Sequence, residues 1–145
     1  MANNVVNILL VEDNSVDAEA IERAFGEAKI ANPIYVAHDG IDGLALLRGE
    51  GVPPIPRPYL ILLDLNMPRM NGFEFLTQLR EDEQLKTSIV FVLTSSDDDR
   101  DKAAAYDKQI AGYMVKSRAG EDFVDLIQLL DHYWRIVEFP PETSS

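Results

Sequence analysis

The stretch Tyr59-Leu60-Ile61-Leu62-Leu63-Asp64 is an unbroken apolar run that ends in a carboxylate. A run of this length, without polar residues at alternate positions, is typical of a strand buried on both faces of a parallel sheet. Met67-Pro68 follows almost directly, and proline does not continue a central strand. An acid at the end of a buried strand adds nothing to packing, so we expect Asp64 to take part in chemistry.

Three further apolar runs also lead into polar residues. They are residues 5–11, followed by Glu12-Asp13, residues 89–93, followed by Thr94-Ser95, and residues 113–115, followed by Lys116. With a shorter run at residues 34–37, apolar segments alternate with amphipathic segments five times. This pattern predicts an α/β fold, in which a five-stranded parallel sheet is covered by helices on both faces.

Each apolar run is followed by a segment that can form a helix. The five helices are expected to begin near Asn14 or Ser15, after Asp39-Gly40, at Asn71-Gly72, at Asp99 and near Phe123. The fourth, over residues 99–108, is rich in alanine and charged residues, and its one large apolar side chain is Tyr106. Because it has little apolar surface to anchor it, this helix is a candidate for movement.

The polar residues that follow the runs are expected to meet in one site. In an open parallel sheet with right-handed crossovers, ligands bind at the carboxyl ends of the strands. Glu12, Asp13 and Asp64 would repel one another there unless a cation neutralised them. We therefore expect Mg²⁺, with Mn²⁺ as an alternative, bound by Asp13 and Asp64 and by Glu12 directly or through water. The tight turn before Pro68 would bring the main-chain carbonyl of Asn66 toward the same ion.

The same residues suit phosphoryl transfer, which needs an in-line nucleophile and positive charge around the phosphoryl oxygens. Asp64 can be the nucleophile, Lys116 and the cation can supply the charge, and Thr94 can donate a hydrogen bond. Tyr113, three residues before Lys116, could change rotamer as part of a switch. A single aspartate after a strand is more often a helix cap, and a single lysine is more often a solvated charge. The full set in this order favours a shared site.

Length and charge limit the other possibilities. The chain has 145 residues, enough for one domain, and its formal net charge of −12 would repel a nucleic-acid backbone. No apolar segment approaches the roughly 18 residues needed to cross a membrane, and nothing suggests secretion. The absence of cysteine excludes a thiol nucleophile. We expect one cytoplasmic domain over residues 5–139 and a disordered tail at residues 140–145, with no nucleic-acid or membrane partner.

In combination, the motifs resemble the receiver domain of two-component response regulators over residues 5–135. The matching motifs are Leu10-Val11-Glu12-Asp13-Asn14, Asp64-Leu65-Asn66-Met67-Pro68 with Asn71-Gly72, Thr94-Ser95 and Val115-Lys116. The resemblance implies a flavodoxin-like (βα)₅ fold with sheet order 2-1-3-4-5. It also implies a signalling protein, not an enzyme, that receives a phosphoryl group on Asp64 from a histidine kinase. The implied roles are metal binding by Glu12, Asp13, Asp64 and the Asn66 carbonyl, switching by Thr94 and Tyr113, and phosphoryl binding by Lys116.

Three further features resemble a narrower group, the single-domain response regulators of cyanobacterial phytochromes. They are the proline-rich loop before Tyr59, the sequence Lys116-Ser117-Arg118, and an extended last helix that bears residues 133–140. This resemblance implies a phytochrome-type histidine kinase as donor and a homodimer through the fourth and fifth helices and the C-terminal extension. From the residues alone, Trp134 and Phe139 are as well suited to cap the core of the monomer. With no output domain after residue 140, the signal would leave by protein–protein contact or by onward phosphotransfer.

One residue departs from the family pattern. The family usually has a proline with a cis bond after the lysine, whereas Ser117 stands at this position. A cis bond before a residue other than proline costs about 2.5–4 kcal/mol, so a trans bond and a different loop are the alternative. The main competing function is an aspartate-nucleophile phosphatase. That class needs a second acid where Asn66 stands, and a cap domain for which the chain has no room.

Overall fold

The computed structural model describes residues 5–141. Its strands form one parallel sheet in the order β2-β1-β3-β4-β5, which confirms the predicted flavodoxin-like topology. The strands are β1 (Asn7–Val11), β2 (Ile34–Ala37), β3 (Tyr59–Leu63), β4 (Ile89–Thr94) and β5 (Gly112–Val115). β1 begins two residues later than the apolar run because Val5 is exposed and lies outside the sheet.

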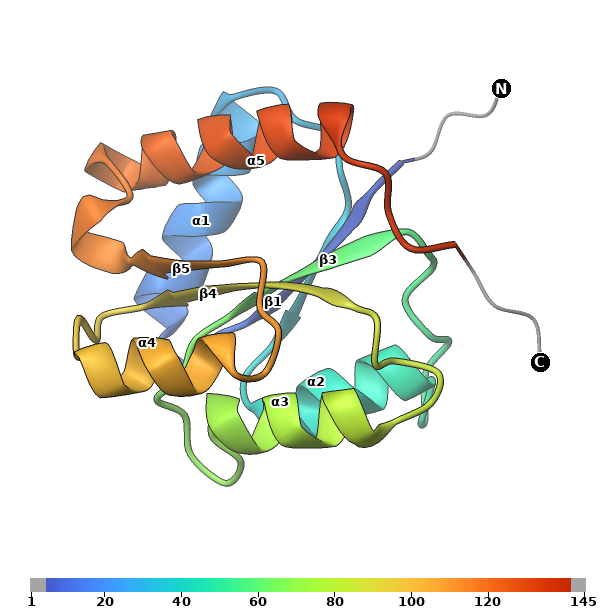
Figure 1. The fold of residues 1–145 in the computed structure, drawn as a ribbon. Coiled ribbons are helices and arrows are strands. Elements are labelled where there is room, and N and C mark those ends of the chain that lie inside the picture. The colour runs from blue at the N-terminus through green and yellow to red at the C-terminus, as the bar shows by residue number, and fades with distance from the viewer. Residues whose placement is uncertain (1–4, 142–145) are drawn as a thin grey trace.

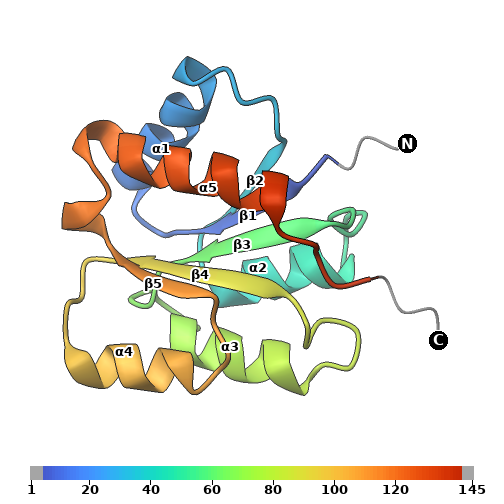
Figure 2. The same cartoon turned by 45° about the horizontal axis from the view of Figure 1, so that its top comes forward.

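Helices cover both faces of the sheet, as Figures 1 and 2 show. They are α1 (Ser15–Glu27), α2 (Gly40–Arg48), α3 (Gly72–Glu81), α4 (Asp99–Tyr106) and α5 (Val124–Ile136), with short turns η1 (Lys116–Arg118) and η2 (Glu121–Phe123). One core cluster lies between the sheet and α1 with α5, and the other lies beneath α2, α3 and α4. Every residue of β1 and β3 is buried, which explains why their sequences show almost no polar alternation.

The register of the strands brings the predicted site residues to one edge. β1 pairs with β3 so that Val11 lies beside Leu63, and Glu12 and Asp64 are therefore the next residues on neighbouring strands. β4 pairs with β5 so that Thr94 lies beside Val115, one residue before Lys116. Residues far apart in the sequence meet because parallel strands end at the same side of the sheet.

α4 is the least firmly anchored of the five α-helices. Ala105 is its one buried residue, and Tyr106 is 53% exposed. The helix ends at Tyr106, two residues earlier than expected. Because more than half of Tyr106 is exposed, it contributes little to holding the helix on the sheet. These observations confirm that the helix has little apolar surface to anchor it, and its movement stays a prediction.

The chain beyond α5 turns back over the core of the same molecule. Trp134 packs beside Phe25, Tyr133 packs edge-on against Phe91 at 5.0 Å between ring centroids, and Phe139 packs edge-on against Tyr133 at 6.2 Å. Trp134 and Phe139 thus contact the core of their own chain, and their role in an interface stays a prediction. Most of the predicted tail, residues 142–145, lies outside the described residues. Within residues 5–141, no helix combines the length and the apolar character that a membrane span requires.

Candidate functional site

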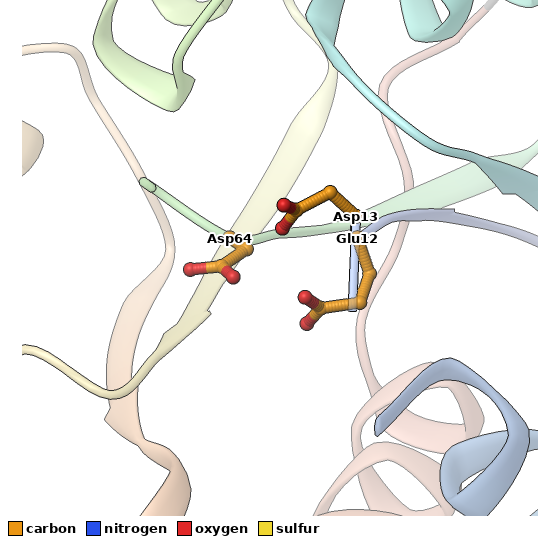
Figure 3. Close-up of side chains that lie close together, drawn as sticks. All are labelled: Glu12, Asp13 and Asp64. Carbon is orange, nitrogen blue, oxygen red and sulfur yellow. The ribbon is translucent and has the colours of Figure 1, made fainter. Parts of the chain in front are cut away.

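Three carboxylates gather where the central strands end. Glu12 and Asp13 follow β1, Asp64 follows β3, and one oxygen of each lies within 4.8 Å of the others. Figure 3 shows the three side chains converging on one region. Glu12 and Asp64 are buried and Asp13 is exposed, so the cluster is reached from solvent on the side of Asp13. Oxygen ligands at this spacing suit a hard divalent cation.

Glu12 is the most deeply buried acid of the cluster, with 1% of the residue exposed. Its Oε2 accepts a hydrogen bond from the main-chain N–H of Asn14 at 3.1 Å. Burial raises the pKa of Glu12 to about 7, although the hydrogen bond from Lys116 opposes this rise and the charge of Asp64 adds to it. A carboxyl group with a pKa near neutrality gives up its proton readily when a cation approaches.

Lys116 places a positive charge among these acids. Its Nζ lies 2.7 Å from Asp17 Oδ2, 2.8 Å from Glu12 Oε1 and 3.3 Å from Asp64 Oδ2. Burial lowers the pKa of Lys116, but the hydrogen bonds to Asp17 and Glu12 outweigh burial and hold the pKa above its ordinary value. The residue is therefore a permanent cation beside Asp64. Within residues 5–141 the one cis peptide bond is Arg57–Pro58, so Lys116 joins Ser117 through a trans bond.

The turn after β3 folds back on Asp64. The main-chain N–H of Asn66 points at Asp64 Oδ1 at 3.4 Å, and the N–H of Gly72 donates to the carbonyl of Leu65 at 2.9 Å. A side chain at Gly72 would lie 2.6 Å from the carbonyl oxygen of Asp64, so only glycine fits. The turn keeps the main chain of Asn66 beside the acids, and metal binding by its carbonyl stays a prediction.

An ion pair between the buried Asp39 and the solvent-exposed Arg69 links this turn to α2. The side chain of Arg69 donates from Nε to Asp39 Oδ2 at 2.6 Å, and Asp39 is 4% exposed. Asp39 also caps α2, since its Oδ1 accepts the N–H of Asp42 at 2.9 Å. The main-chain N–H of Gly40 donates to the carbonyl of Met70 at 3.2 Å. These contacts fix the backbone on the side of Asp64 that faces α2.

The two predicted switch residues lie on neighbouring strands, Thr94 at the end of β4 and Tyr113 in β5. Thr94 is fully buried, and among the described residues its hydroxyl has no hydrogen-bond partner. Burying a hydroxyl without a partner costs folding free energy. The Thr94 hydroxyl is therefore a hydrogen-bond donor at the end of β4 that is free to bind a ligand atom. Tyr113 donates from its hydroxyl to the carbonyl of Ser96 at 3.0 Å, which ties β5 to the loop that follows Thr94.

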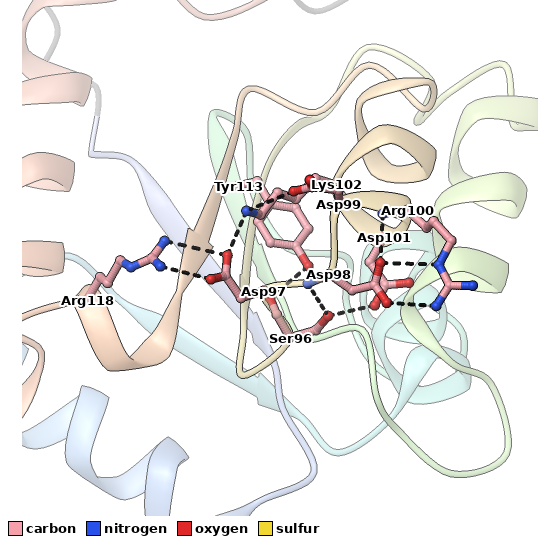
Figure 4. Close-up of polar contacts among 9 residues, drawn as sticks. All are labelled: Ser96, Asp97, Asp98, Asp99, Arg100, Asp101, Lys102, Tyr113 and Arg118. Atoms are coloured by element: carbon pink, nitrogen blue, oxygen red, sulfur yellow. Dashed lines mark hydrogen bonds and ion pairs between the residues drawn. The ribbon is translucent and has the colours of Figure 1, made fainter.

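Charged contacts hold the loop between β4 and α4, as Figure 4 shows. Asp97 accepts from Lys102 of α4 at 2.6 Å and from Arg118 of η1 at 2.8 Å. The hydroxyl of Ser96 donates to Asp101 at 2.6 Å. Asp97 thus links the loop to α4 and η1, and Asp98 caps α4; neither acid belongs to the cluster in Figure 3.

The sequence reasoning missed Asp17 and the pair Asp39–Arg69. Asp17 lies in the first turn of α1, one helical turn beyond Asp13, and this spacing is the signal that could have pointed to it. Acids in a first turn usually just favour the helix dipole, so the signal is weak. No local pattern relates Asp39 to Arg69, because 30 residues separate them.

The fold and the acid cluster together define the class of flavodoxin-like receiver proteins. Residues 8–128 match the family described as the response regulator receiver domain. The chain belongs to this family, and it is a signalling protein rather than a classical enzyme.

Relatives narrow the assignment. Response regulator Rcp1 of Synechocystis is 34% identical over 88% of this chain and 87% of its own length. FilR2 of Methanothrix harundinacea, a probable methanogenesis regulatory protein, is 37% identical over 88% of this chain and 82% of its own. The solved Mn²⁺-bound form of Rcp1 has a TM-score of 0.80 and 33% identity, covering 94% of this chain and 99% of that chain. The phosphorylated cyanobacterial phytochrome response regulator RcpA has a TM-score of 0.83 and 32% identity over the same shares. The chain is a response regulator related to those of phytochromes.

Proposed function

We propose that this protein accepts a phosphoryl group on Asp64 from a histidine kinase of the phytochrome type in the cytoplasm. The observation that carries the proposal is the acid cluster of Figure 3 with the ammonium of Lys116 at its edge. Acids alone would suit a cation, and a lysine alone would suit an anion. A site with both suits an anionic group that is transferred to a carboxylate beside a cation.

Each residue of the site has a separate role in the phosphoryl transfer. An oxygen of Asp64 attacks the phosphorus, the new O–P bond forms, and the bond from phosphorus to the donor histidine nitrogen breaks. Mg²⁺ bound by Glu12, Asp13, Asp64 and the Asn66 carbonyl would offset the negative charge of the phosphoryl oxygens. Lys116, already within 3.3 Å of Asp64, supplies further positive charge without moving far.

The conformational response to phosphorylation begins at the Thr94 hydroxyl, which has no hydrogen-bond partner within residues 5–141. A phosphoryl oxygen on Asp64 offers this buried donor the partner that it lacks, so Thr94 turns toward Asp64. That movement pulls on the loop to which the hydroxyl of Tyr113 is bound. Since α4 is weakly anchored, it shifts and presents a different surface to a partner protein or a phosphoryl acceptor.

The proposed donor follows from the relatives, and the proposed assembly is consistent with the exposed apolar residues of α5. The solved neighbours include a phosphorylated cyanobacterial phytochrome response regulator and a bacteriophytochrome response regulator. By analogy with these proteins, a phytochrome-type kinase is the donor. We further propose that two copies associate through α4, α5 and the segment after α5. Leu129 and Ile136 on α5 are exposed apolar residues available for such a contact, while Phe139 is engaged within the monomer.

The proposal is tested with purified kinase phosphorylated on its histidine. In Mg²⁺ the wild-type chain should take one phosphoryl group, and Asp64→Asn should take none. Glu19→Gln, which changes an exposed acid of α1, is the matched control and should behave like the wild type. Equal labelling of Asp64→Asn would contradict the assignment. Many turnovers of a small phosphate ester per protein would instead support the phosphatase alternative.

A further inference from the structure

The ammonium of Lys116 has more carboxylate partners than the proposed chemistry requires. Glu12 and Asp64 belong to the acid cluster, but Asp17 does not. The contact of Lys116 with Asp17 is nevertheless the shortest of the three, at 2.7 Å. The side chain of Asp17 is 28% exposed, so it meets Lys116 at the border between the buried site and solvent.

A divalent cation and this ammonium compete for the same oxygens. Both are positive, and both would lie against Glu12 and Asp64, so a bound cation repels Lys116 and weakens its contacts with those two acids. A buried ammonium that loses its partners is costly, unless another carboxylate stays with it. Asp17 is the acid in a position to do this, since it holds Lys116 from outside the cluster.

We propose that Asp17 is a positioning residue that keeps Lys116 beside Asp64 while a divalent cation takes over Glu12. This inference rests on the proposed function of the same site. Asp17 does not touch the phosphoryl group or the cation. It acts through Lys116, by giving the ammonium a partner that the cation does not claim.

The test is the affinity for Mg²⁺, measured by calorimetry on the full chain without any phosphoryl donor. Asp17→Asn should weaken Mg²⁺ binding by about tenfold, because Lys116 then keeps its contact with Glu12 and competes with the cation for that acid. Glu19→Gln is the matched control, since it removes one charge from an exposed position of the same helix. It should change the affinity by less than about twofold.

Repeating the measurement in a Lys116→Gln variant shows whether Asp17 acts on Mg²⁺ affinity through Lys116 or directly on the cation. In Lys116→Gln, the further change Asp17→Asn should lower Mg²⁺ affinity no more than Glu19→Gln does, because there is no ammonium left to position. If Asp17 acted on the cation itself, its removal would weaken binding at least as much in this background. That outcome would overturn the inference.

The unfolding temperature separates the proposed role of Asp17 from a purely structural role in α1. If Asp17 served only as a first-turn acid of α1, Asp17→Asn would lower the unfolding temperature and leave Mg²⁺ affinity equal to that of the control. Equal affinity overturns the inference and leaves the proposed function intact. A wild-type chain that binds no Mg²⁺ overturns the proposed function and the inference with it.

Discussion

Replacing Glu12 by glutamine tests whether the buried acid destabilises the metal-free protein. The folded state raises the pKa of Glu12 from 4.5 to about 7, chiefly through burial. Below pH 4.5 the carboxyl is protonated in the folded and unfolded chain alike, and its contribution to stability is fully present. As the pH rises through about 7, the folded chain must ionise it in a buried site, and that contribution is lost.

The size of the effect follows from the pKa. A shift from 4.5 to about 7 corresponds to a total of about 3 kcal/mol, of which about 2–3 kcal/mol falls between pH 5 and pH 8. Glutamine has nearly the same shape and does not ionise. We expect Glu12→Gln to gain about 2–3 kcal/mol relative to the wild type when the pH is raised from 5 to 8.

Urea unfolding in the presence of a chelator measures this difference at both pH values. The single tryptophan, Trp134, packs beside Phe25 and reports unfolding through its fluorescence. Glu19→Gln is the control, and its stability relative to the wild type should be the same at both pH values. The reasoning is refuted if the stability difference between Glu12→Gln and the wild type does not change with pH.

Three further predictions concern the frame of the site. Asp39→Ala should lower the free energy of unfolding by about 2 kcal/mol in urea, because it removes a helix cap and the buried acid that pairs with the exposed Arg69, whereas Asp39→Asn keeps the cap and should lose less. Phe139→Ala should cost about 1–2 kcal/mol in the same assay, since it removes a ring from Tyr133; an unchanged stability would mean that the extension does not cap the monomer. Gly72→Ala should weaken Mg²⁺ binding in calorimetry, because the new Cβ meets the backbone of the loop that carries the acids. Gly26→Ala, with open space around it, should leave binding unchanged.

Strand identity and order were predictable because the signals are local and strong. Apolar runs such as residues 59–63 can hardly be anything but buried strands, and the rules for parallel sheets then bring Asp13, Asp64 and Lys116 to one edge. Helix starts were also predictable, because Asn14 and Asn71 cap helices through their own side chains.

The supporting contacts could not be predicted in the same way. The pair of Asp39 with Arg69 depends on how two loops approach each other, and neither loop carries a pattern that specifies this. The contact of Asp17 with Lys116 spans 99 positions and depends on side-chain direction at the start of α1. Whether Phe139 faced its own core or a second copy depended on the path of the chain after α5, which periodicity does not encode.

The measurement that tests the central claim most directly locates the phosphoryl group. The protein is treated with acetyl phosphate and Mg²⁺, the acyl phosphate is reduced with borohydride, and the modified residue is found by peptide mass spectrometry. The account predicts that position 64 is converted to homoserine in the wild type, and that Asp64→Asn shows no conversion anywhere. Conversion at Asp13, or an unmodified position 64 in a fully phosphorylated sample, would contradict it.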